Sequence, residues 1–244
     1  MKSATTREAS RNLIHGRNAV LEAARAGRVV KVYQAAGVGH DPRLVELARL
    51  AAVEVVTPQQ LDVMAPGVNQ GVAAELKPRR EWSLRELLDT EPSLLVALDS
   101  IMDPQNLGAI LRSAEVGGAD GAIVPQHRSA PISPAAVKAS SGATELLPIA
   151  LVSGMPSAID QVKRAGIWCV ALDVRGDTWP WDFDLTQRVC VVVGAEGQGV
   201  HRLVLERCDV RLKLPVRGHV SSLNASAAAA ALLYEVVRQR AHHG

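Results

Sequence analysis

The sequence predicts an α/β protein, in which a C-terminal part built around a parallel sheet follows a smaller α/β unit. Short runs of β-branched residues alternate with amphipathic helical patterns along nearly the whole chain. The runs beyond residue 93 are continuously apolar, which is typical of parallel strands buried on both faces. A polar, charged stretch with two prolines, residues 77–93, separates the two parts.

The first unit is predicted to have helices over residues 16–27, 41–51 and 57–65, and strands over 29–36, 53–56 and 71–76. Gly27 ends the first helix, and Thr57 followed by Pro58 is a typical start for the third. The charged stretch that follows is predicted to be a connector with one short helix. These patterns place a first domain at residues 1–77, a linker at 78–92 and a second domain at 93–244.

The second unit continues the alternation. Strands are predicted over residues 94–101, 121–125, 146–152, 167–174, 188–194 and 209–215, and helices over 106–118, 134–142, 156–166, 201–208 and 222–240. Strands that alternate with helices form parallel sheets covered on both faces. Such sheets bind ligands in the loops after the carboxyl ends of their strands, so those loops are the expected place for a site.

Composition restricts the classes of protein to which the chain can belong. The first dozen residues are polar, and no apolar stretch approaches the roughly 18 residues that span a bilayer, so a cytoplasmic location is expected. Three cysteines without a CxxC pair predict neither a disulfide framework nor a metal site. A net charge of +2 and an aromatic content of 3% leave any nucleic-acid binding to local clusters of arginine.

A glycine-rich loop follows the strand predicted at 188–194, in the sequence VVVGAEGQGV of residues 191–200. It has neither the G-x-G-x-x-G spacing of dinucleotide-binding loops nor the Lys-Ser/Thr pair of phosphate loops. Glu196 inside the loop would repel a pyrophosphate, so the loop favours a neutral or cationic ligand. The alternative is a tight turn in which the glycines only supply positive φ angles.

A second segment, LDSIMDPQNLGAILRSA of residues 98–114, joins a predicted strand to a predicted helix. Asp103-Pro104 is typical of a turn, and Asn106 is a suitable helix N-cap. Arg112 lies in an otherwise apolar stretch, so we expect it to be partly buried and paired with a carboxylate or a phosphate. The alternative is that Asn106 only caps the helix and that Arg112 is a solvated charge.

The third segment is LPVRGHVSSLNASAAAAALLYE, residues 214–235. Ser222 and Asn224 would be about 200° apart around a helix, so they can converge only across its first turn. We therefore expect the last helix to begin between Ser221 and Asn224. Ordinary capping by Ser221 or Ser222 is an alternative explanation of these residues.

Taken together and in this order, the three segments resemble the three signature motifs of the SpoU family of RNA ribose 2'-O-methyltransferases, in the SPOUT superfamily. The similarity runs in register over residues 94–240. Residues 14–33 are similar to the small L30e-like RNA-binding domain that precedes the catalytic domain in the subgroup that methylates a guanosine of bacterial 23S rRNA. Residues 127–152 are also similar to that subgroup.

The resemblance implies a SPOUT domain whose C-terminal third forms a trefoil knot, preceded by an L30e-like domain that binds the RNA substrate. It implies S-adenosylmethionine as cofactor and a homodimer with active sites at the subunit interface. The residues that would line the cofactor pocket are Gly194, Gly197, Gly199, Leu214 and Leu223. The catalytic cluster would comprise Asn106, Arg112, Glu196, Ser222 and Asn224.

Methyl transfer to a ribose hydroxyl requires a group that orients the hydroxyl and a group that helps to remove its proton. The family usually assigns the base role to the counterpart of Arg112, although a guanidinium with a pKa above about 12 resists deprotonation. An equal alternative is that Arg112 clamps the target phosphate and lowers the pKa of the hydroxyl. Glu196 would anchor either Arg112 or backbone amides of the knot.

Basic residues of the first unit and of the linker form the expected RNA surface. The set comprises Arg11, Arg17, Arg25, Arg28, Lys31, Lys77, Arg79 and Arg80, together with Arg217 of the third motif. His219 is either a proton acceptor or a solvated side chain. The expected partners are RNA, with rRNA favoured over tRNA, and a second copy of the chain, without a membrane or a metal.

Rival functions share parts of this pattern. A tRNA ribose 2'-O-methyltransferase and an antibiotic-resistance methyltransferase of 23S rRNA would carry the same catalytic motifs. A catalytically silent RNA-binding assembly factor would have no physical need for the complete polar cluster. A nicotinamide-dependent dehydrogenase is disfavoured because the phosphate-binding fingerprint is missing.

Overall fold

The computed structural model describes residues 13–219 and 222–241, which form two sheets. The first sheet has the order β1-β4-β2-β3, with β1 (Leu13–His15), β2 (Val29–Ala35), β3 (Val53–Val56) and β4 (Val72–Leu76). β2 and β3 are parallel, whereas β4 runs antiparallel to both β1 and β2. β1 was not predicted, because three residues are too few to reveal an alternating pattern.

Three helices of the first unit confirm the sequence prediction to within a few residues: α2 (Arg17–Arg25), α3 (Pro42–Leu50) and α4 (Pro58–Met64). Thr57 caps α4 in a reciprocal capping box with Gln60, so the predicted start of this helix is confirmed. Gly27, which ends α2, has a φ of 68°, a conformation that glycine adopts at little cost.

The second sheet is entirely parallel, as predicted. Its order is β10-β8-β9-β5-β6-β7, from β5 (Leu94–Asp99), β6 (Gly121–Pro125), β7 (Ile149–Val152), β8 (Trp168–Leu172), β9 (Val189–Gly194) and β10 (Val210–Leu212). β5 and β9 pair along their full lengths at the centre of the sheet.

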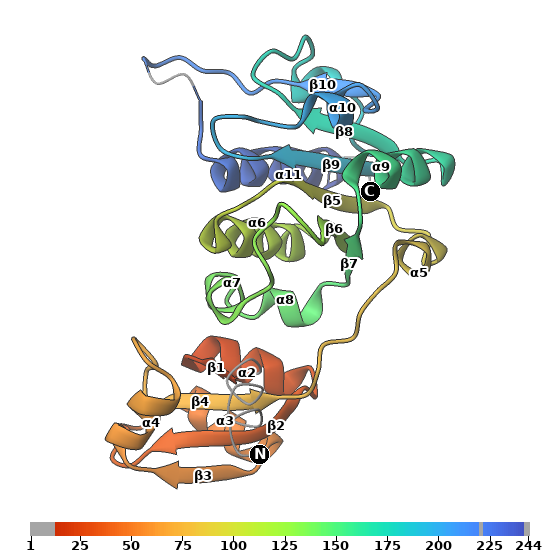
Figure 1. The fold of residues 1–244 in the computed structure, drawn as a ribbon. Coiled ribbons are helices and arrows are strands. Elements are labelled where there is room, and N and C mark those ends of the chain that lie inside the picture. The colour runs from red at the N-terminus through yellow and green to blue at the C-terminus, as the bar shows by residue number, and fades with distance from the viewer. Residues whose placement is uncertain (1–12, 220–221, 242–244) are drawn as a thin grey trace.

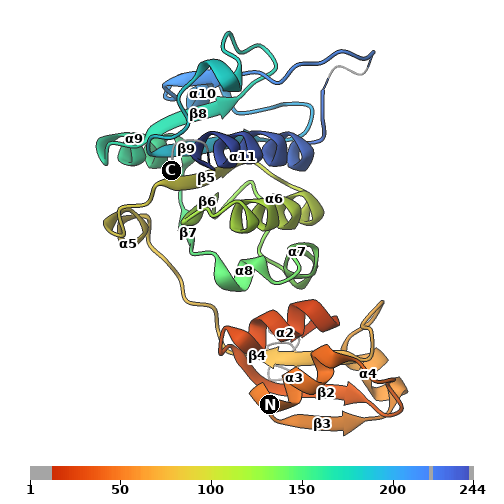
Figure 2. The ribbon, with the colours of Figure 1, turned by 180° about the vertical axis from the view of Figure 1, so that it is seen from behind.

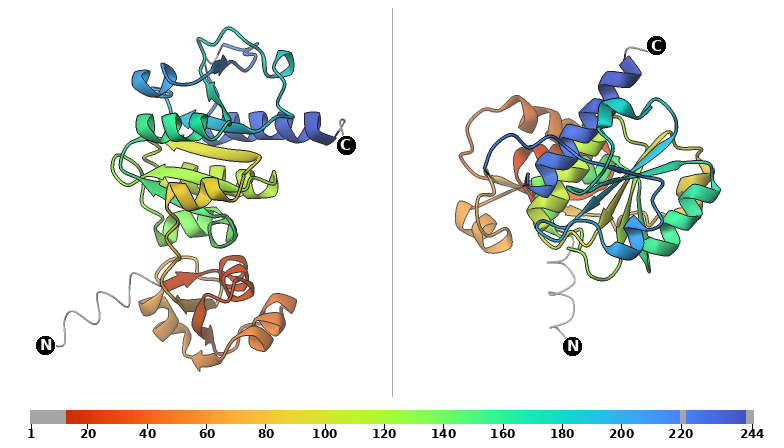
Figure 3. Two further views of the ribbon diagram at one scale, coloured as in Figure 1. Left: turned by 90° about the vertical axis from the view of Figure 1, so that its right-hand side faces the viewer. Right: turned by 90° about the horizontal axis from the view of Figure 1, so that it is seen from above.

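Helices cover both faces of this sheet, as two further views show (Figure 3). One face carries α6 (Pro104–Val116) and α11 (Ala225–Ala241), and the other carries α5 (Leu84–Asp89), α9 (Met155–Arg164) and α10 (Arg202–Leu205). Leu94, Val96 and Leu98 of β5 face the first set, whereas Leu95 and Ala97 face the second. Burial on both faces explains why the strand is apolar at every position.

Two short helices, α7 (Pro134–Ala139) and α8 (Ala143–Leu146), lie between the two units in opposite views (Figures 1 and 2). Val137 of α7 packs into the core of the first unit, and Lys138 Nζ donates a hydrogen bond to the carbonyl of Val68 at 2.9 Å. The linker is also partly built into the second unit, because Trp82 forms a bridge with Ala150 and Leu87 of α5 packs beneath the sheet. The first unit is therefore docked on the second.

The cysteines are free; Cys169 and Cys190 are buried, and Cys208 is half-buried. Burial raises the pKa of the Cys208 thiol to about 12. Within residues 13–219 and 222–241, no cluster of histidine, cysteine and carboxylate side chains is arranged to hold a metal ion. No helix in the same ranges is long and apolar enough to cross a membrane.

Candidate functional site

The two central strands end side by side, which brings two of the three motifs together. Asp99, the last residue of β5, is paired in register with Gly194, the last residue of β9. The glycine-rich loop therefore starts beside the segment that leads into α6. This is the carboxyl edge of the sheet, where the sequence predicted a site.

The glycines of this loop are required by its backbone. A Cβ atom on Gly194 would lie 2.0 Å from the carbonyl carbon of Gly199, so no larger residue fits. Gly197 and Gly199 have positive φ angles of 78° and 69°. The loop closes on itself, since the Gly199 amide donates to the carbonyl of Ala195 at 2.8 Å. Gly197 and Gly199 thus supply the positive φ angles of a tight turn, which both interpretations of the loop require.

Asp99 fixes the far end of the loop, a role that the sequence analysis missed. Its side chain is buried, and its Oδ2 accepts a hydrogen bond from the His201 amide at 2.7 Å. The Ser100 hydroxyl donates to Oδ1 at 3.3 Å. One feature of the sequence could have revealed this role: Asp99 is an acidic residue at the end of an otherwise apolar strand. A buried carboxylate needs hydrogen-bond donors, so such a residue is expected to bind nearby backbone or hydroxyl groups.

Three predicted catalytic residues meet at this edge. The side-chain amide of Asn224 donates to Asn106 Oδ1 at 3.0 Å and to Glu196 Oε2 at 3.2 Å, and Asn106 Nδ2 lies 3.5 Å from the same carboxylate oxygen. Residues from α6, from the glycine-rich loop and from the start of α11 thus form one polar cluster. Among the described residues, Glu196 has no ion-pair partner.

The prediction that Asn106 is a helix N-cap is wrong. The helix begins at Pro104, and Asp103 is its N-cap, with Oδ1 accepting from the Gln105 amide at 3.0 Å. The Pro104 ring is pre-organised for the first helical position, which moves the helix start two residues earlier than predicted. Asn106 therefore lies in the first turn, and its side chain is available to Glu196.

The start of the last helix is also corrected. α11 begins at Ala225, and Asn224 is its cap, since Asn224 Oδ1 accepts from the Ser226 amide at 2.8 Å and from its hydroxyl at 2.6 Å. The helix does not include Ser222, which is exposed and has no hydrogen bond to the cluster within the described chain. Because the cap uses Oδ1, the amide group of Asn224 points to Asn106 and Glu196. Ser221 lies outside the described residues.

Arg112 does not have the environment that the sequence predicted. Its side chain is exposed on α6 and forms no ion pair with any described residue of the chain. The neighbouring apolar residues face the core. A helix that packs on one face of a sheet still presents its other side to solvent, and Arg112 lies on that side. Glu196 is held by two amides and not by Arg112.

The third motif follows β10 as an irregular segment. Leu214 is half-buried, whereas Leu223, Arg217 and His219 are exposed. The segment is anchored at Lys213, whose ammonium lies 4.6 Å from the ring centroid of Trp179. Trp179 in turn stacks on Trp181, with ring centroids 5.4 Å apart. This anchor was missed, although the aromatic pair in TWPW was visible in a chain poor in aromatic residues.

The predicted RNA surface is partly neutralised by carboxylates. Ion pairs join Arg17 to Asp41, Arg25 to Glu22 and Glu46, Lys31 to Glu54, and both Arg28 and Arg79 to Glu145. Lys77 bonds a backbone carbonyl, Arg80 lies over the ring of Trp82, and Arg217 has no ion-pair partner in the described residues. Arg11 lies outside those residues. The sequence shows how many cations this surface contains, but it does not show which carboxylates form ion pairs with them.

Comparison with known proteins identifies the family. The profile of the SpoU rRNA Methylase family matches residues 93–234, which is more than half of the chain. The chain belongs to this family. A second profile, RNA 2'-O ribose methyltransferase substrate binding, matches residues 13–82. This SpoU protein is therefore an RNA 2'-O-methyltransferase that uses S-adenosylmethionine, as the motifs implied.

Relatives and solved structures agree with this family. The chain is 39% identical to the 23S rRNA (guanosine-2'-O-)-methyltransferase RlmB of Pseudomonas syringae, over 87% of this chain and 89% of that protein. It is 41% identical to an uncharacterized tRNA/rRNA methyltransferase of Mycolicibacterium vanbaalenii, over 93% and 76%. The SpoU methyltransferase AviRb from Streptomyces viridochromogenes, solved with AdoMet, aligns with a TM-score of 0.81 at 29% identity, over 99% of this chain and 94% of AviRb.

The SpoU site contains groups that suit this cofactor. The glycine-rich loop leaves its backbone open to a ligand, because Gly197 and Gly199 have no neighbouring atom within 4 Å of a Cβ position. The Glu196 carboxylate, which has no cationic partner among the described residues, suits a positively charged sulfonium better than a phosphate. Gly194, Gly197, Gly199, Leu214 and Leu223 are the residues that would hold it.

Proposed function

We propose that the chain methylates the ribose 2'-hydroxyl of a guanosine in 23S rRNA. The observation that carries the proposal is the cluster of Asn106, Glu196 and Asn224 beside the glycine-rich loop. A relative of nearly the same length, the RlmB protein of Pseudomonas syringae, supports this choice of substrate.

In this proposal, Glu196 and Arg112 have different roles toward the ribose 2'-hydroxyl. When bound, S-adenosylmethionine supplies an electrophilic methyl group. The amides of Asn106 and Asn224 hold Glu196 through its Oε2, so that Oε1 is left to accept a hydrogen bond from the ribose hydroxyl. Arg112 holds the phosphate beside the target ribose, because its guanidinium remains protonated and has no carboxylate partner in the described chain. Its positive charge lowers the pKa of the hydroxyl.

The test is to incubate the protein with labelled S-adenosylmethionine and either 23S rRNA fragments or tRNA, and then to map each 2'-O-methyl group. Methylation of one guanosine in 23S rRNA is expected. Methylation confined to tRNA would refute the rRNA assignment and favour the tRNA alternative. The name of the Mycolicibacterium relative, a tRNA/rRNA methyltransferase, is compatible with either substrate. Binding of rRNA without any methylation would point to a silent assembly factor.

The domain limits proposed from the sequence remain residues 1–77, 78–92 and 93–244. The two family profiles, which cover residues 13–82 and 93–234, support a division close to these limits. We propose that the first domain is L30e-like and that it contacts the RNA substrate. Expression of residues 93–244 alone tests the division: the fragment should bind S-adenosylmethionine but bind rRNA more weakly than the full chain.

The trefoil knot and the homodimer also remain proposals. Close backbone approaches of the kind a knot requires support the first, since a Cβ on Gly176 would lie 2.6 Å from the carbonyl oxygen of Arg211. Exposed apolar side chains on the outer helices, Val116 of α6 and Tyr234 of α11, support the second. Light scattering of the purified protein tests the dimer, and a crystal structure traces the knot.

A further inference from the structure

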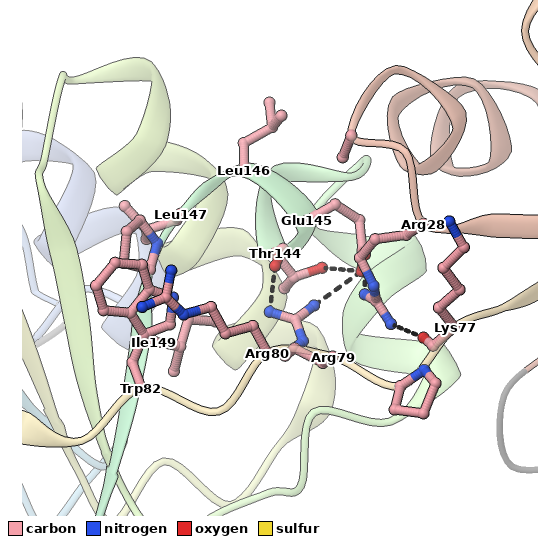
Figure 4. Close-up of a pocket in the computed structure, with 13 residues that line it drawn as sticks. Arg28, Lys77, Arg79, Arg80, Trp82, Thr144, Glu145, Leu146, Leu147 and Ile149 are labelled. Atoms are coloured by element: carbon pink, nitrogen blue, oxygen red, sulfur yellow. Dashed lines mark hydrogen bonds and ion pairs between the residues drawn. The ribbon is translucent and has the colours of Figure 1, made fainter. Parts of the chain in front are cut away.

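A pocket of about 360 Å³ lies where the first unit, the linker and α8 meet (Figure 4). Its charged lining residues are Arg28 of the first unit, Lys77, Arg79 and Arg80 of the linker, and Glu145 of α8. The lining therefore carries four positive charges and one negative charge. We call it the junction pocket.

Glu145 neutralises only part of this charge. Its side chain is fully buried, and it forms ion pairs with both Arg28 and Arg79, the latter at 2.8 Å between Arg79 Nη2 and Glu145 Oε1. Figure 4 shows the carboxylate between the two guanidinium groups. One carboxylate thus serves two largely buried arginines, and one positive charge is left without a counter-ion inside the junction.

Two further observations show that the pocket favours an anion. Burial lowers the pKa of Arg79 to about 10, and the nearby Arg28 adds to this effect. In addition, the Nε of Arg28 is buried and has no acceptor among the described residues. An oxyanion in the pocket would supply the missing negative charge.

The other two cations of the lining, Arg80 and Lys77, are more exposed than Arg28 and Arg79. The guanidinium of Arg80 lies 3.9 Å from the ring centroid of Trp82, and its nearest carboxylate, that of Glu86, is 3.8 Å away. Lys77 Nζ donates to the carbonyl of Gly27 at 2.9 Å and retains two further donors. Neither side chain pairs with Glu145, so both can be removed without breaking the ion pairs beneath them.

We propose that the junction pocket binds a phosphate of the RNA backbone. The proposal rests on the proposed function, because the pocket joins the region that matches the substrate-binding profile to the methylase region. Its volume of about 360 Å³ is within the range of small-ligand sites. A strand bound there would contact both units and would hold the first unit in a fixed position relative to the catalytic edge.

The test uses Arg80→Ala and Lys77→Ala in the full chain, with Arg85→Ala as matched control. Arg85 lies on the nearby α5, is 89% exposed and does not line the pocket. Affinity for a 23S rRNA fragment is measured over a series of salt concentrations. Each pocket variant should bind about 5- to 10-fold more weakly, and the magnitude of the slope of log K against log salt should fall by about 0.7 to 0.9 for each lost phosphate contact. S-adenosylmethionine affinity and Tm should not change, and Arg85→Ala should bind like the wild type.

A second arm separates RNA from free phosphate. Tm is measured in inorganic phosphate and in chloride at equal ionic strength. If Arg80→Ala loses a phosphate-induced rise in Tm but keeps its rRNA affinity, the pocket holds free phosphate and the proposal is overturned. It is also overturned if both pocket variants bind rRNA like Arg85→Ala while the wild type methylates that RNA. Failure of the wild type to methylate any RNA, with the variants still weakened in binding, would instead overturn the proposed function alone.

Discussion

Asn224 donates its side-chain amide to Asn106 Oδ1 at 3.0 Å, and so joins the start of the last helix to the first turn of α6. The two residues are 118 positions apart in the chain. The contact exists because Asn224 caps α11 with its Oδ1, which turns the amide group toward the site. A structural role and a functional role are therefore combined in one side chain, and a substitution can separate them.

Asn224→Asp should separate these roles. Aspartate caps a helix as well as asparagine, so α11 should keep its start, and any fall in Tm should come only from the lost amide hydrogen bonds and the new carboxylate pair. The variant loses the amide donor and places a second carboxylate beside Glu196, at a cost of about 1.5–3 kcal/mol for a hydrogen bond to a charged group. Methyl transfer under single-turnover conditions should fall by about 10- to 150-fold. Retention of the wild-type rate would show that the amide has no role in the reaction.

Arg112→Ala should abolish methyl transfer and leave the affinity for S-adenosylmethionine nearly intact. The arginine is exposed and has no ion-pair partner in the described residues, so its removal should change the free energy of unfolding by less than about 0.5 kcal/mol. The rate should fall by at least about 100-fold, the effect of losing one preorganised charge donor. Calorimetric titration with the cofactor is the control, and loss of cofactor binding would contradict the assignment.

Gly194→Ala should disrupt the glycine-rich loop. The new Cβ would lie 2.0 Å from backbone atoms of Gly199, which cannot move without opening the loop. Overpacking of this kind costs about 1–3 kcal/mol, and the affinity for S-adenosylmethionine should fall by at least 10-fold. Gly154→Ala is the matched control, because nothing lies within 4 Å of its Cβ position. Equal cofactor affinities for the two variants would show that the loop tolerates the side chain.

Stability should decrease at acid pH through His15. Burial lowers the pKa of His15, the nearby Lys138 lowers it further, and Nδ1 has no partner among the described residues. The native state therefore binds fewer protons than the unfolded state, so stability is complete above about pH 6.5 and falls as the pH drops below that value. Thermal unfolding of His15→Asn should show a weaker decrease at acid pH than the wild type. Identical curves for the two proteins would exclude His15 as the cause.

The sequence alone determined most of the strands and helices of both units and the residues of the three motifs. Continuous apolar runs predicted β5 and β9, because both faces of these strands are buried. The glycines within residues 194–199 indicated a loop with positive φ angles. Such features are local, so they can be read without knowing the fold. β1 and α8 were missed because neither short element stands out as an apolar run or as a helical pattern in the sequence.

Only the tertiary structure decided which of these residues meet. Asn106, Glu196 and Asn224 share hydrogen bonds across 28 to 118 residues, whereas Arg112 and Ser222 do not join them within one chain. The same holds for charge: Arg28 and Arg79 are paired with Glu145, which lies 117 and 66 residues away. The physical reason is that a side chain's partners depend on how strands are ordered and where helices begin, and neither is encoded in the local period of the sequence.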